Sequence, residues 1–132
     1  MLTLVIAAAL LQSDACNAVD RPGPPGCPDW QMLHNGPEAK VFAEPASVRR
    51  DGNGFEVRLR LIFAADLSNG SRSGIVTYRF DCAAETGTLL QSRYYSAAGT
   101  PLPAGPRPSG RALASPPGSP NRAALDRFCP RR

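Results

Sequence analysis

The sequence predicts an α+β fold that is mostly β, with a small antiparallel sheet and one C-terminal helix docked by a disulfide. Residues 55–63 and 75–82 both alternate apolar and polar side chains. This alternation is typical of strands that are buried on one face and solvated on the other. The second strand ends at an inward-facing cysteine, Cys82, and residues 120–128 have a short helical pattern that ends beside Cys129. A disulfide between these two cysteines would join the helix to the sheet.

The first predicted strands lie between residues 40 and 63. Residues 40–43 form a short strand that Pro45 interrupts, because proline cannot donate a hydrogen bond to a neighbouring strand. Residues 47–49 resume the strand and lead into Asp51-Gly52-Asn53-Gly54, which is a strong hairpin signal. Residues 55–63 follow with five inward-facing apolar side chains. These are Phe55, Val57, Leu59, Leu61 and Phe63.

The second half of the predicted sheet follows a polar loop at residues 64–74. This loop leads into the strand at 75–82, and a turn at 85–87 leads into a further strand at 88–95. Residues 99–120 form a proline-rich excursion that is longer than ordinary connections. Ser119 and Pro120 then resemble an N-cap followed by proline at the first helical position, so we expect the C-terminal helix to begin there.

Four cysteines lie at positions 16, 27, 82 and 129, and they allow three pairings. None of them has the Cys-x-x-Cys spacing of a zinc or redox site, so disulfides are favoured over metal binding. We favour the pairs Cys16–Cys27 and Cys82–Cys129. If processing removes or acylates Cys16, Cys27 is left as a free thiol. The bridge between Cys82 and Cys129 would stabilise the fold by about 4 kcal/mol on the chain-entropy model.

The N-terminus is predicted to be a targeting segment. Residues 2–11 are apolar except for Thr3 and too short to span a bilayer, so residues 1–15 are interpreted as a signal peptide with cleavage after Ala15 or Ala18. Residues 16–28 are rich in proline and glycine and are interpreted as a flexible or extended linker. The remaining residues, 29–132, form the predicted domain. A lipid anchor at Cys16 stays open as an alternative and is the only route to membrane contact that we consider.

The net charge of +4 comes almost wholly from arginine, since Lys40 is the only lysine. This charge fits an anion-binding surface, but it also fits a genome whose base composition favours arginine. Nucleic acid binding fits the charge but not the export signal. His34 is the only histidine and is expected in a turn, while Asp81 and Glu85 are expected to be solubilising groups or partners of Arg79. We find no catalytic motif, metal site or cofactor site, so no enzyme is predicted.

The candidate anion-binding residues are Arg58, Arg60 and Arg79. All three are predicted on the outer face of strands, with Tyr95 on the outward register of a further strand. If these strands are neighbours, the arginines form a cationic stripe that could bind an anionic glycan, a lipid headgroup or an acidic protein segment. The alternative is ordinary charge on a solvated face, partly neutralised by Glu56 and Asp81.

From Trp30 to Cys129 the sequence resembles the surface-adhesin protein E family of Gram-negative bacteria. The order of several short segments carries the resemblance, together with two cysteines. The segments are Trp30, Val41 to Arg49, Val57 to Arg60, Phe80 to Ala83, Leu89-Leu90, Tyr94-Tyr95 with Gly99, Pro117 to Ser119, and Phe128-Cys129. Glu44 stands where the family usually has Asp. The resemblance implies an antiparallel sheet with a C-terminal helix. It also implies an exported, often surface-exposed protein, whose named member binds host matrix proteins, plasminogen and haem.

Two functional hypotheses follow from the sequence and this resemblance. The first is a non-enzymatic binding module outside the cytoplasm, at the cell surface or in the periplasm, that engages host or envelope proteins or anionic surfaces. The alternative is a periplasmic structural or accessory protein without an adhesive role. The family's ligands cannot be assigned to residues of this chain, so neither plasminogen nor haem binding is carried over.

Overall fold

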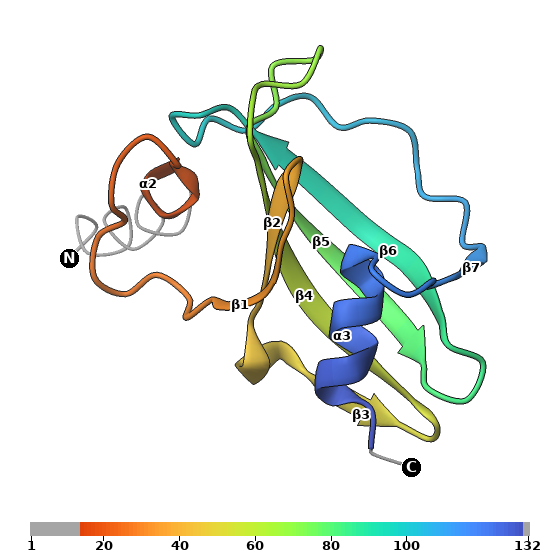
Figure 1. Ribbon diagram of the computed structural model, residues 1–132. Coiled ribbons are helices and arrows are strands. Elements are labelled where there is room, and N and C mark those ends of the chain that lie inside the picture. The colour runs from red at the N-terminus through yellow and green to blue at the C-terminus, as the bar shows by residue number, and fades with distance from the viewer. Residues whose placement is uncertain (1–13, 131–132) are drawn as a thin grey trace, which may run out of the picture.

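The computed structural model describes residues 14–130 and shows one curved antiparallel sheet with a helix against it (Figure 1). Most of the predicted signal peptide, residues 1–13, lies outside the described residues. The order of strands across the sheet is β1-β2-β4-β5-β6-β7, and β3 pairs separately with β4. The strands are β1 (Gln31–Asn35), β2 (Ala39–Ala43), β3 (Arg49–Asp51), β4 (Gly54–Phe63), β5 (Ser73–Asp81), β6 (Thr86–Tyr95) and β7 (Ala112–Ala114). The predicted α+β fold class is therefore confirmed.

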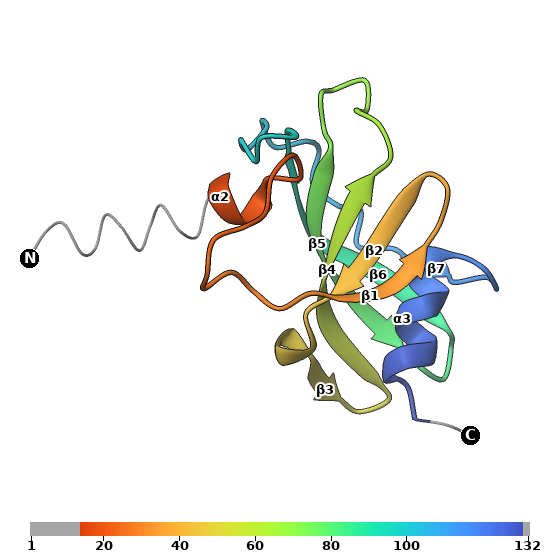
Figure 2. The same ribbon diagram turned by 60° about the vertical axis from the view of Figure 1, so that its left-hand side comes forward.

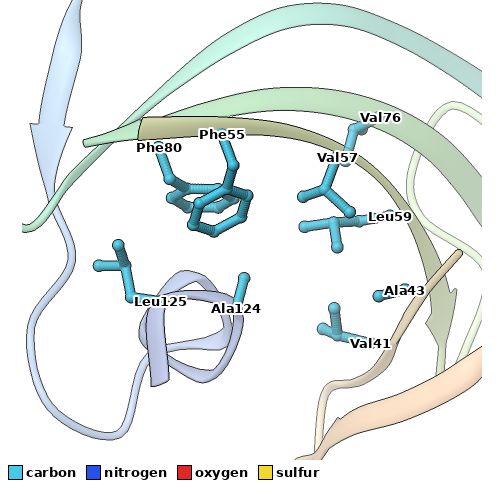
Figure 3. Close-up of a cluster of buried hydrophobic side chains, with 9 residues drawn as sticks. All are labelled: Val41, Ala43, Phe55, Val57, Leu59, Val76, Phe80, Ala124 and Leu125. Carbon is cyan, nitrogen blue, oxygen red and sulfur yellow. The ribbon is translucent and has the colours of Figure 1, made fainter. Parts of the chain in front are cut away.

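The inner face of the sheet forms the hydrophobic core. Phe55 lies opposite Phe80 and Leu59 lies opposite Val76, so the alternating positions of β4 and β5 meet on one face. Their side chains are almost fully buried beneath the helix, as Figure 3 shows. The inward face predicted for residues 75–82 is thus correct. Nearer the end of β4, Leu61 and Phe63 are only half-buried.

The C-terminal helix, α3 (Pro120–Phe128), begins at the predicted residue. The Ser119 hydroxyl accepts a hydrogen bond from the backbone N–H of Arg122 at 3.2 Å, which satisfies one of the free donors at the start of the helix. Ala124 and Leu125 are buried against the sheet. At the other end of the helix Cys129 is bonded to Cys82, with 5.7 Å between their Cα atoms, so the predicted covalent docking is confirmed.

Three short elements between residues 31 and 114 were not predicted. The edge strand β1 lacks apolar alternation, and it pairs with β2 through a bulge between Met32 and His34. Residues Pro45–Ser47 form a 3-10 helix, η1, where we expected the strand to resume at 47–49; β3 begins two residues later than that. The edge strand β7 has only three residues within the proline-rich excursion, and such a short stretch carries no periodic signal.

The N-terminal segment crosses the side of the sheet opposite α3, as Figure 2 shows. It begins with the single turn α2 (Asp14–Asn17), and a Cys16–Cys27 disulfide closes it into a loop. The backbone N–H groups of Val19 and Asp20 donate to the Ala97 carbonyl at 2.9 and 3.3 Å. The segment predicted as a linker is therefore attached to the turn that follows β6. None of the helices within residues 14–130 has the length and apolar character needed to cross a membrane.

Candidate functional site

The outer face of the sheet carries the polar side chains of β4, β5 and β6. Arg58 lies opposite Thr77, and Thr77 lies opposite Gln91 on the next strand. Ile75 lies opposite Arg93 in the same way. Because directly opposed residues of antiparallel strands point to the same face, these five side chains form a continuous surface.

An open groove of about 980 Å³ lies over this surface. Its floor includes Ile75 and Thr77 of β5, Gln91 and Arg93 of β6, and Arg58 of β4. On the side of the N-terminal segment, the groove is lined by Cys16, Asn17, Pro28 and Trp30. Residues 104–108, which belong to the proline-rich excursion, also line it. The groove therefore combines a strand surface with two irregular segments that are far apart in the sequence.

The groove is positively charged. Its lining residues include Arg58, Arg93 and Arg107, and they include no aspartate or glutamate. Arg93 and Arg107 are exposed and form no ion pair with any residue between 14 and 130. Guanidinium groups without an internal carboxylate are available to bind an external anion.

Arg58 differs from the other two groove arginines because it already has an acidic partner. Its Nε donates to Glu44 Oε1 at 3.0 Å, and a terminal nitrogen contacts the same oxygen. The Glu44 side chain is only 11% exposed, against 48% for Arg58. Arg58 therefore compensates a nearly buried carboxylate and adds less positive charge to the groove than its position implies.

Arg60 lies on the outer face, but it is partly covered by the N-terminal segment. Its guanidinium donates to the Ala18 carbonyl at 3.4 Å, and its Nε has no hydrogen-bond partner among the described residues. Burial lowers the pKa of the Arg60 guanidinium. Tyr95 is on the same face, opposite Ser73, and is also buried. This end of the outer face is consequently shielded from solvent.

Arg79 is at the other end of the outer face, opposite Glu56. Its guanidinium pairs with Asp51 at 3.1 Å, and it does not line the groove. The three arginines proposed from the sequence thus share one face, but each has a partner within the protein. Only Arg58 lines the groove.

The two groove arginines without acidic partners were missed at the sequence level for different reasons. Arg93 lies in the strand predicted at 88–95 and could have been placed on the outer face by its two-residue spacing from Tyr95. A bulge within β6 also shifts the register at Leu90, which is exposed and lines the groove. Arg107 lies in the proline-rich excursion, where no periodicity assigns a direction to a side chain.

Among the remaining polar candidates, His34 lies in strand β1 and not in the turn predicted for it, and the two carboxylates have structural roles. Asp81 accepts hydrogen bonds from the backbone N–H groups of Ala83 and Ala84 at 2.9 and 3.0 Å, which orders the turn after β5. Glu85 pairs with Arg122 of α3 at 2.9 Å and raises the pKa of that guanidinium. Within residues 14–130, no three His, Cys, Asp or Glu side chains are grouped closely enough to hold a metal ion.

The fold and its groove define a small, disulfide-bonded domain with the form of a binding module. The sequence profile of the surface-adhesin protein E family matches residues 30–130, so the chain belongs to that family. Its family is one of surface adhesins, so the chain is an adhesin-like protein. The resemblance seen in the short sequence segments is confirmed.

Two solved structures of Haemophilus influenzae protein E, one of them of crystal form II, share the fold. Each has a TM-score of 0.59 and 16% sequence identity, and the match covers 83% of this chain and 91% of the other. No curated protein matches the sequence significantly. At this level of identity the likeness establishes the fold, while the groove must be interpreted from this chain's own residues.

Proposed function

We propose that this protein is a non-enzymatic binding module that acts outside the cytoplasm and binds anionic partners in the outer-face groove. The observation that supports this proposal is the pair Arg93 and Arg107, two exposed guanidinium groups in a groove without carboxylates. Partners of suitable chemistry are host or envelope proteins with acidic segments, and anionic glycans or lipid headgroups. Membership of an adhesin family supports an exported location.

Binding to a heparin hexasaccharide tests the proposal directly. Replacing both Arg93 and Arg107 with Gln should weaken binding about tenfold, because each exposed ion pair contributes roughly 0.2–1 kcal/mol. The interaction should also weaken as salt rises from low concentration to 0.15 M, where exposed charges are screened over about 8 Å. Isothermal titration calorimetry at two salt concentrations measures both effects.

A matched control removes the same amount of charge elsewhere. Lys40 and Arg49 are exposed, form no ion pair with residues 14–130, and do not line the groove. The variant in which both are replaced by Gln should bind the hexasaccharide nearly as well as the wild type. Equal loss in the two double variants would show that net charge alone is responsible and would overturn the groove as the binding site.

Cell-surface labelling tests the location. Treatment of intact Gram-negative cells with a membrane-impermeant biotin ester should label Lys40, the one lysine, if the protein faces the medium. Labelling that appears only after the outer membrane is permeabilised would favour the periplasmic structural or accessory role.

A further inference from the structure

Strand β6 has an open edge beside the groove. One edge of β6 pairs with β5 along its length. The other edge pairs with β7 only from Thr86 to Thr88. At the far end of β6, Tyr95 forms an isolated β-bridge with Pro101, and the Tyr94 carbonyl accepts a hydrogen bond from the Leu102 backbone N–H. Between these points, residues 89–93 make no backbone hydrogen bond to any described segment other than β5. About half of their N–H and C=O groups face away from β5, because the groups of a strand alternate in direction.

The protein's own chain passes this edge without pairing to it. Figure 1 shows the segment after β6 bowing away from the strand before it reaches β7. Four of its residues are prolines, which have no N–H to donate to a neighbouring strand. These are Pro101, Pro103, Pro106 and Pro108. The composition of the excursion therefore keeps it from closing the edge that it passes.

The side chains around the open edge indicate the chemistry of an occupant. Leu90, Gln91, Ser92 and Arg93 all line the groove, so the open edge and the cationic surface form one site. Arg107 belongs to the same lining, as does Trp30, which provides apolar contact area. A partner that satisfies both the free backbone groups and the arginines is an extended peptide with acidic side chains.

We propose that the β6 edge at residues 89–93 binds an extended acidic peptide segment of a partner protein as an additional antiparallel or parallel strand. Backbone hydrogen bonds would hold the peptide, and its carboxylates would contact Arg93 and Arg107. The inference rests on the proposed binding role of the groove and names the class of partner and its mode of binding. The bulge at Leu90 interrupts the regular edge, so the added strand is short and its side-chain contacts decide specificity.

A synthetic ten-residue peptide of alternating Glu and Val tests the mode of binding. A second peptide has the same sequence but is methylated at the backbone nitrogens of its Val residues. A third is methylated instead at the backbone nitrogens of its Glu residues. One methylated peptide loses the donors that face β6, whereas both keep the same charge. Fluorescence anisotropy should show that one of them binds more than tenfold more weakly than the unmodified peptide, while the other binds nearly as well.

Hydrogen exchange of the full chain locates the contact. With unmodified peptide present, the backbone amides of residues 89–93 that face away from β5 should exchange at least tenfold more slowly, measured by ¹H–¹⁵N NMR. The amides of β1, at the opposite edge of the sheet, provide the internal control. The Arg93→Gln, Arg107→Gln double variant should reduce the protection, and the Lys40→Gln, Arg49→Gln variant should not.

The outcomes separate the two proposals. Equal binding of all three peptides, or no protection at residues 89–93, would overturn strand addition and leave the groove as a charge-based site. If the Lys40→Gln, Arg49→Gln variant lost both heparin binding and peptide binding, this would overturn the proposal that the groove is the binding site. Protection that appears without peptide and rises with protein concentration would assign the edge to a second copy of the chain, which also overturns the proposal.

Discussion

Arg58 and Glu44 form an ion pair on the outer face of the sheet, where a nearly buried carboxylate is covered by a half-exposed guanidinium. The Glu44 backbone N–H also donates to the Arg58 carbonyl at 3.1 Å, so the two residues are held together through both backbone and side chains. The sequence alone presented Arg58 as a free outer-face cation. Its principal contact is instead internal, which changes what a substitution at this position should do.

Replacing Arg58 with Gln should destabilise the protein, because the Glu44 carboxylate would lose its charged partner while it remains largely buried. We expect a loss of about 1–3 kcal/mol in the free energy of unfolding, measured by urea denaturation. Arg79→Gln is the matched control, since both Arg79 and its partner Asp51 are substantially exposed; it should cost less than about 0.5 kcal/mol. Equal losses in both variants would contradict a special role for the Glu44 pair.

Gly87 leaves space for the ring of Phe80 in the core. The two residues lie opposite each other on β6 and β5, and a Cβ added at position 87 would lie 2.8 Å from Cε1 of Phe80. Gly87→Ala should therefore force the ring to move and lower the free energy of unfolding by about 1–3 kcal/mol. Gly105→Ala is the control, because no atom lies within 4 Å of its added Cβ, and its melting temperature should stay nearly unchanged. A stable Gly87→Ala variant would show that the core can relax around this position.

The sequence predicted the parts of the fold that depend on periodic burial. The strands at 55–63 and 75–82 and the helix at 120–128 were found because their inward residues must meet in one core. The edge strand β1 was missed because its polar residues have no such period. The groove was missed because it depends on the folding back of two proline-containing segments over β5 and β6. Only tertiary structure brings Trp30, Arg93 and Arg107 together.

The disulfide between Cys82 and Cys129 should contribute strongly to stability because both residues pack against the core and the bond closes a long loop. Their separation of 47 residues corresponds to about 4 kcal/mol on the chain-entropy model. Replacing both cysteines with Ser should lower the melting temperature by about 10 °C or more, measured by circular dichroism. The Cys16→Ser, Cys27→Ser variant should lose less stability, because its bridge closes a loop of only 11 residues, which corresponds to about 3 kcal/mol on the same model, and neither residue belongs to the core cluster. A larger effect from the N-terminal pair would contradict this assignment.

The Cys16–Cys27 disulfide leads to a prediction about whether Cys16 is lipidated when the protein is processed. The sulfur of Cys16 is bonded to Cys27, and a sulfur in a disulfide cannot also carry the thioether of a lipid anchor. The protein purified from cell envelopes should therefore show an intact Cys16–Cys27 bridge in non-reducing peptide mapping, and its N-terminal peptide should lack the mass of a diacylglyceryl group.

The Cys27→Ser variant provides the comparison, because it frees the Cys16 thiol and opens the loop that lines one side of the groove. We expect this variant to bind the acidic peptide more weakly, while its melting temperature falls less than that of the Cys82→Ser, Cys129→Ser variant. A lipid on Cys16 in the wild-type protein, with Cys27 as a free thiol, would contradict the paired arrangement and would assign the N-terminal segment to membrane attachment instead.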